Sequence, residues 1–137
     1  MAGNFHIFQK RVAAPDLNIN ARALSGGFSS DPIDVSGFNQ LTLFLTLTWT
    51  AASDVTFFVE SSNDGGSTWH RLQVQTDVSS AGVVTLKDGQ FKKAVTATTR
   101  WRVNMPLNDQ FIRLGTVAAT GATSDTLTVE AKLGAFT

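Results

Sequence analysis

The chain has 137 residues, a length typical of one domain and sufficient to bury a hydrophobic core. It carries eleven basic and eleven acidic side chains, so its formal charge is zero, and it contains no cysteine. The neutral charge argues against nucleic acid as the main partner, and the lack of cysteine excludes disulfides, thiolate metal sites and thiol catalysis.

The predicted elements are β-strands along the whole chain. Weak strands are expected at 5–12 and 17–24, before the strongest one at 41–50, where leucines alternate with threonines and a phenylalanine. No segment keeps a helical period of 3.6 residues. Further strands are expected at 55–60, 70–74, 83–86, 91–96, 100–105, 111–117 and 126–133.

Turn sequences separate these strands, which predicts an all-β fold. Each strong strand has one apolar and one polar face, as in antiparallel sheets that cover a core. We therefore predict a single antiparallel β-sandwich over residues 1–137, with a jelly roll favoured over an immunoglobulin-like sandwich. The terminal segments 1–14 and 131–137 contain apolar residues, without clean alternation in the N-terminal one. They are expected to dock as edge strands of the same domain, or else to act as arms that interact with a neighbour.

No membrane segment is expected. The N-terminus has no basic stretch followed by an apolar run, and the apolar-leaning run at 41–49 is too short to span a bilayer. We expect synthesis in a cytoplasm and no membrane partner.

Residues 62–69 read Ser-Asn-Asp-Gly-Gly-Ser-Thr-Trp, the pattern known as the Asp-box. It lies between two predicted strands, so its physical role is that of a hairpin turn. Asp64 can accept backbone N–H groups, and Gly65 and Gly66 can take positive φ angles. Trp69 can pack under the turn as its anchor.

The Asp-box also occurs in sialidase propellers, but the rest of the chain does not support catalysis. A propeller needs at least about four blades of four strands. Glycosidases need two acids about 5 to 10 Å apart, and sialidases use a tyrosine nucleophile, whereas this chain has no tyrosine. The acids Asp54, Glu60, Asp64, Asp77 and Asp88 show no pairing, and Arg71, Arg100, Arg102 and Arg113 are dispersed.

We expect no metal or cofactor. His6 and His70 lack metal-binding spacing, and Asn63-Asp64 lacks the Asp-x-Asp-x-Asp pattern of a calcium loop. A carbohydrate-binding β-sandwich module is an alternative, since Trp49, Trp69 and Trp101 could form an aromatic platform. The alternation places Trp49 and Trp101 with core residues instead.

Two phrases carry a family resemblance. Residues 34–43 read Asp-Val-Ser-Gly-Phe-Asn-Gln-Leu-Thr-Leu, and residues 59–69 lead through Val-Glu-Ser into the Asp-box. Together they resemble small virion structural proteins of tailed bacteriophages, most of all capsid cement (decoration) proteins. The resemblance covers about residues 31–72; tail or baseplate components have similar sequences and remain an alternative.

The resemblance implies a non-enzymatic oligomer on the capsid exterior that clamps neighbouring capsid subunits. Its partners would be the major capsid protein and further copies of itself, with a dimer slightly favoured over a trimer. The expected location is the virion, after assembly in the host cytoplasm. Candidate interface residues are those of the terminal arms: Phe5, Phe8, Lys10, Arg11 and Phe136.

Overall fold

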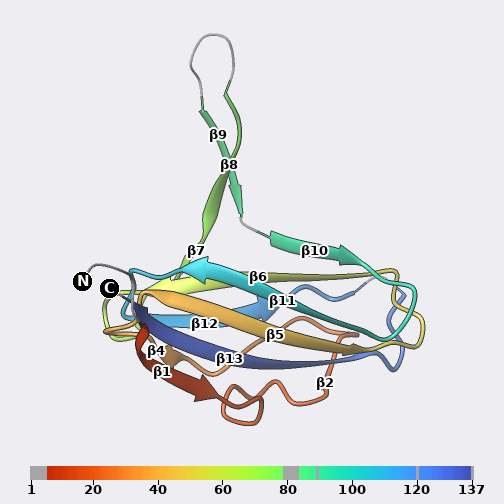
Figure 1. Cartoon of the computed structure of the whole chain (residues 1–137). Coiled ribbons are helices and arrows are strands. Elements are labelled where there is room, and N and C mark those ends of the chain that lie inside the picture. Colours follow the sequence, from red (N-terminus) through yellow and green to blue (C-terminus); the bar gives the residue numbers. More distant parts are fainter. Residues whose placement is uncertain (1–5, 79–83, 89, 120, 137) are drawn as a thin grey trace.

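The chain forms two antiparallel β-sheets packed face to face, with a hairpin that stands away from both (Figure 1). The computed structural model describes residues 6–78, 84–88, 90–119 and 121–136, and the side chains of 8–72, 94–119 and 121–135. No helix occurs in these ranges. The predicted all-β sandwich is therefore confirmed.

Sheet A has four strands that lie side by side, and a short fifth strand pairs with one of them. In spatial order they are β1 (His6–Val12), β13 (Thr126–Phe136), β5 (Gln40–Thr48) and β11 (Thr99–Pro106), and β2 (Arg22–Ala23) also pairs with β13.

Sheet B has six strands, and the hairpin forms a two-stranded sheet of its own. In spatial order sheet B holds β10 (Gln90–Ala94), β6 (Asp54–Ser62), β12 (Phe111–Thr116) and β3 (Phe28–Ser29), while β4 (Ile33–Asp34) also pairs with β12 and β7 (His70–Arg71) with β6. The hairpin strands are β8 (Gln73–Val78) and β9 (Val84–Asp88).

The order of the strands is that of a jelly roll. The first strand β1 pairs with the last strand β13, the β3–β4 segment pairs with β12, β5 pairs with β11, and β6 pairs with β10. The chain thus folds back on itself as a long hairpin does. When the β3–β4 segment is counted as one strand between β1 and β5, successive strands alternate between the two sheets except at β6 and β10. An immunoglobulin sandwich has a different strand order, so the preference for a jelly roll is confirmed.

The core lies between the sheets and follows the period-two pattern of the strands. The four leucines of β5, Leu41, Leu43, Leu45 and Leu47, are at most 2% exposed. They meet the inward side chains of β6, β12 and β13, which belong to one apolar cluster. Burial of each such side chain contributes about 1.5–3 kcal/mol relative to exposure, so this alternation is the main source of stability.

The strand expected at 17–24 is wrong. Leu17, Ile19 and Leu24 are buried, but the segment from 14 to 18 is a turn, and only β2 remains extended. Asn18 and Ala21 have φ angles of 59° and 51°, which no regular strand tolerates. The alternation of apolar residues there reflects a buried loop held by turn hydrogen bonds such as Asn18 N–H to the Pro15 carbonyl at 3.0 Å.

The hairpin interrupts one edge strand of sheet B. β7 and β10 both pair with β6, where Arg71 lies opposite Glu60 and Gln90 lies opposite Phe58. Between them, the Leu72 N–H donates to the Val59 carbonyl at 3.0 Å. The chain therefore leaves β6 after Leu72 and returns at Gln90 without skipping a position on β6.

Candidate functional site

The Asp-box forms a tight turn between β6 and β7. The Asp64 Oδ1 atom accepts the N–H groups of Ser67 at 3.1 Å and Thr68 at 2.8 Å, and the Ser62 hydroxyl donates to it at 2.7 Å. The Ser62 Oγ in turn accepts the Gly66 N–H at 3.0 Å. Gly65 and Gly66 have φ angles of 74° and 91°, so both need the conformational freedom of glycine.

These hydrogen bonds determine the charge state of Asp64. The backbone N–H of Thr68, then the hydroxyls of Ser62 and Thr68, lower the pKa of Asp64 to about 2. A carboxylate that stays ionised and accepts bonds from its own turn is unsuited to be a general acid. The geometry gives Asp64 the role of a turn cap.

The first resembling phrase forms a second turn. The Phe38 N–H donates to the Val35 carbonyl at 3.1 Å, and Gly37, at the third position of this β-turn, has a φ angle of 81°. The Asp34 Oδ1 accepts the Ser36 N–H at 2.9 Å. This bond, the Ser36 hydroxyl and the charge of Lys10 lower the pKa of Asp34.

Gln110 joins the two turns, although they lie far apart in sequence. Its carbonyl accepts the Val35 N–H at 2.9 Å, and its side-chain Oε1 accepts the Gly65 N–H at 2.9 Å. Its own N–H donates to the Asn63 Oδ1 at 2.9 Å. We call Gln110 and the two turns that it connects the Gln110 joint. Sequence reasoning missed Gln110, because an isolated glutamine in a polar loop is part of no motif.

The outer face of sheet B holds a ladder of arginines and aromatic rings. The Arg71 guanidinium lies 3.6 Å from the Phe58 ring centroid, and the Arg113 guanidinium lies 4.4 Å from that of Trp69. Glu60 lies between the two arginines, at 3.0 Å from Arg113 Nε and 3.9 Å from Arg71. The fold thus gathers two arginines that are dispersed in the sequence, but it places a carboxylate of the chain itself between them.

The tryptophans do not share one face. Trp49 and Trp101 pack against the core cluster, and the Trp49 Nε1 donates to the Ala52 carbonyl at 2.8 Å. Trp69 is half-buried on the outer face of sheet B beside Arg113. The aromatic platform considered for carbohydrate binding is therefore not assembled from these three residues.

The terminal strands pair with each other at the edge of sheet A. Phe8 is 54% exposed and stacks on Phe38, with ring centroids 5.5 Å apart, next to the first turn of the Gln110 joint. Lys10 and Arg11 are exposed on the same strand. Phe5 and the side chain of Phe136 lie outside the described residues, although the backbone of Phe136 lies opposite His6.

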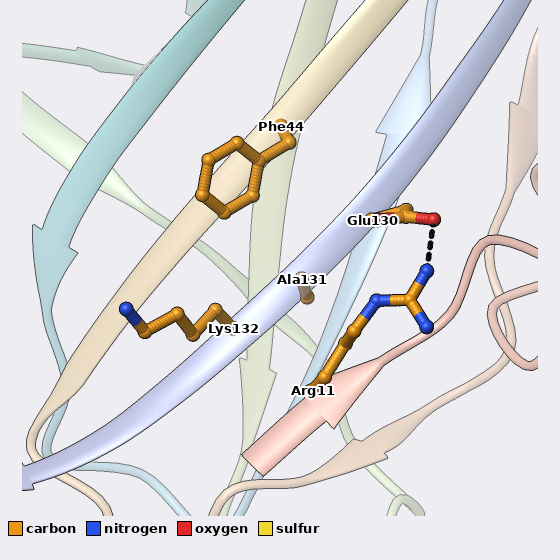
Figure 2. A pocket seen from close by; sticks show the side chains of 5 residues that line it. All are labelled: Arg11, Phe44, Glu130, Ala131 and Lys132. Atoms are coloured by element: carbon orange, nitrogen blue, oxygen red, sulfur yellow. Dashed lines mark hydrogen bonds and ion pairs between the residues drawn. The ribbon is translucent and has the colours of Figure 1, made fainter. Parts of the chain in front are cut away.

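A shallow hollow of about 290 Å³ lies on the outer face of sheet A, beside this edge. Arg11, Phe44, Glu130, Ala131 and Lys132 line it, and the Arg11 guanidinium donates to Glu130 (Figure 2). Phe44 is 42% exposed there. The sequence contains a signal for this hollow, because Phe44 is an apolar residue at a position of β5 where the alternation otherwise places polar, outward side chains.

Metal and membrane features are not found in the part of the chain that the structure describes. Its histidines and carboxylates form no group of three that could hold a metal ion. It contains no long apolar helix of the kind that crosses a membrane.

Comparisons with known proteins show similarity at the level of structure alone. No protein-family model matches the chain, and no curated protein matches it. Among solved structures, the chain is similar to the SPBc2 prophage-derived protein YomS at 10% sequence identity, with a TM-score of 0.48 and coverage of 98% of this chain and 96% of that chain. This similarity is too low to carry a functional assignment, so the jelly-roll assignment depends on the chain's own strand order.

Proposed function

We propose that this chain is a non-enzymatic structural protein of a phage virion that binds the outer surface of the capsid. It would stabilise the capsid by clamping neighbouring subunits of the major capsid protein. The observation that carries the proposal is the Gln110 joint. The two phrases that resemble cement proteins form one hydrogen-bonded unit, beside the exposed Phe8, rather than two separate turns.

The chemistry of the joint supports a binding role. Asp34 and Asp64 both use their carboxylates to cap backbone N–H groups, which lowers both pKa values and leaves neither residue ready to transfer a proton. What the joint does provide is an end of the sandwich where hydrogen bonds hold two turns together, which favours a rigid surface. Rigid surfaces bind with a smaller loss of conformational entropy than mobile ones.

Stabilisation would follow from mass action. A protein that binds the assembled capsid, but not free capsid subunits, shifts the equilibrium toward the assembled state. Many copies make modest single interfaces collectively large, and self-association into a dimer, favoured here over a trimer, would add avidity. The contacts proposed for this role are Phe5, Phe8, Lys10, Arg11 and Phe136.

The proposal is tested with capsids assembled from the major capsid protein alone. Purified chain is added, binding is measured by co-sedimentation, and capsid disruption is followed by scanning calorimetry. We expect binding and a higher disruption temperature, both reduced by Phe8→Ala combined with Arg11→Ala. Binding to isolated tails with no binding to heads would replace the proposal with the tail or baseplate alternative.

A further inference from the structure

Charge is unevenly divided between sheet A and the rest of this neutral chain. The five strands of sheet A contain a single acid, Glu130, among the eleven acids of the chain. The rest of the chain holds five basic and ten acidic residues. The six basic residues of sheet A are Lys10, Arg11, Arg22, Arg100, Arg102 and Lys132.

Four of these basic residues share the outer face of sheet A with Phe44. Across the strands, Arg102 lies opposite Phe44 and Phe44 lies opposite Glu130. In the neighbouring row of outward side chains, Arg11 on β1 lies opposite Lys132 on β13. Arg100 lies two positions from Arg102 along β11, opposite Thr46 on β5. Arg11, Arg100 and Arg102 are exposed. The exposed Phe44 ring therefore has Arg100 and Arg102 on its β11 side, and Lys132 with the Arg11–Glu130 ion pair on its β13 side, on an otherwise threonine-rich face.

We propose that this outer face of sheet A docks onto a carboxylate-rich surface of another protein. The guanidinium groups of Arg100 and Arg102 can each bind a carboxylate through two parallel hydrogen bonds. Phe44 supplies an aromatic side chain at the centre of the face, and aromatic residues are enriched in the cores of protein interfaces. The proposal deepens the proposed function, because it gives the capsid partner an acidic surface, and it rests on that function.

The same face is a poor match for nucleic acid. The ten acids and five bases outside sheet A would oppose the long-range attraction of a polyanion that extends past this face, whereas a local patch of carboxylates on a protein would meet the face alone. A second copy of the chain fits less well too, because three of its acids, Asp34, Asp64 and Asp125, already accept hydrogen bonds from their own backbone.

The test compares two double charge reversals in binding to capsids assembled without this chain. Arg100→Glu with Arg102→Glu changes the outer face of sheet A; Lys87→Glu with Lys92→Glu makes the same change in net charge on β9 and β10. We expect the first to weaken co-sedimentation by at least about tenfold, and the second to bind as the unmodified chain does. Phe44→Ala should weaken binding as well.

The outcomes separate the two proposals. If the unmodified chain binds capsids and the Arg100→Glu, Arg102→Glu variant binds equally well, the docking surface is wrong and the proposed function stands. If the unmodified chain does not bind, the proposed function is wrong. Circular dichroism checks folding, and Arg100→Gln with Arg102→Gln, which removes the charges without reversing them, should give an intermediate loss.

The chemistry of the face is tested without a capsid on immobilised polyglutamate and single-stranded DNA. We expect the unmodified chain to be retained on polyglutamate at low salt, and the Arg100→Glu, Arg102→Glu variant to elute earlier. Stronger retention on DNA, lost in the same variant, would overturn the choice of protein carboxylates. Concentration-dependent self-association abolished by this variant would identify a second copy as the occupant and overturn it also.

Discussion

At the scale of single residues, Asp125 is a buried side chain held by several hydrogen bonds. It is 1% exposed, and its carboxylate accepts the N–H groups of Thr50, Ala51 and Ala52 at 2.8 to 3.3 Å and the Thr50 hydroxyl at 2.7 Å. Burial alone would raise the pKa of Asp125, but the bonds from Thr50, Ala52 and Ala51 outweigh it and lower the pKa to about 2. The loop between β5 and β6 is thereby tied to the start of β13.

Replacing Asp125 by asparagine should make stability less dependent on pH. The folded pKa of about 2 lies below the ordinary 3.8, so the carboxylate stabilises the fold above pH 4 and loses this effect as pH falls toward 2. We expect Asp125→Asn to lower the free energy of unfolding by roughly 2 kcal/mol at pH 7, because its NH₂ group cannot accept these bonds. Urea denaturation at pH 7, 4 and 2.5 should show the difference from the unmodified chain shrinking; a constant difference would contradict the assignment.

Position 115 accommodates only glycine, because the Phe58 ring fills the space where a Cβ atom would lie. A Cβ atom at this position would overlap the Phe58 ring, which is 7% exposed and lies beneath Arg71. We expect Gly115→Ala to lower the free energy of unfolding by about 1–3 kcal/mol through overpacking. Gly26→Ala is the matched control, because nothing lies within 4 Å of its added methyl group. Similar unfolding midpoints for the two variants would show that the ring moves aside freely.

At the scale of elements, the sequence predicted strands best where one face is buried and the other meets solvent. β5 and β13 follow their alternation along nearly their whole length. The two-residue strands β3 and β4 were missed, because so short a segment shows no period and depends on its neighbour β12. Segment 17–24 was wrongly predicted to be a strand, because apolar and polar residues can alternate in a buried loop as they do in a strand.

The candidate site was predictable only in part, for a related reason. The Asp-box and the turn at 34–38 each have a local signature, because their glycines and capping acids act on nearby backbone. Gln110 bonds to residues more than forty positions away, and no local pattern encodes that. Nor could the sequence alone place Arg102 opposite Phe44, because that cross-strand pairing depends on strand order.

The hairpin should be removable without loss of the sandwich. Because Leu72 bonds to Val59 and Gln90 lies opposite Phe58, deleting 73–89 joins Leu72 directly to Gln90 in register on β6. We expect this variant to keep its β-sheet circular dichroism spectrum and a cooperative thermal transition. The control, deletion of 73–88, retains one extra residue. This residue forces either a β-bulge or a one-residue shift in register, and the shift would point the side chains of β10 to the opposite face of sheet B.

The in-register deletion should therefore melt at a higher temperature than its control. Equal melting temperatures for the two deletions would mean that β10 adds nothing to sheet B. Loss of folding in the in-register variant would mean that the hairpin is part of the core structure rather than an insertion in an edge strand.

At the scale of the whole molecule, the jelly roll explains how a neutral chain acquires a positively charged face. The basic residues of sheet A come from four strands that span the sequence from β1 to β13, and they meet only because those strands are interleaved. Such pairings are mostly distant in sequence, so we expect slow folding, in milliseconds to seconds. Stopped-flow tryptophan fluorescence measures this rate.

The pairing of the first strand with the last also makes the chain almost a closed ring. His6 lies opposite Phe136, so a short linker could join the two ends, and new ends could be cut between Val78 and Val84 in the hairpin. Such a circular permutant should fold into the same sandwich, because new termini in an element outside both sheets break neither of them. Its two ends would then belong to the hairpin, which stands away from both sheets (Figure 1), so a cargo fused there would be attached outside the sandwich.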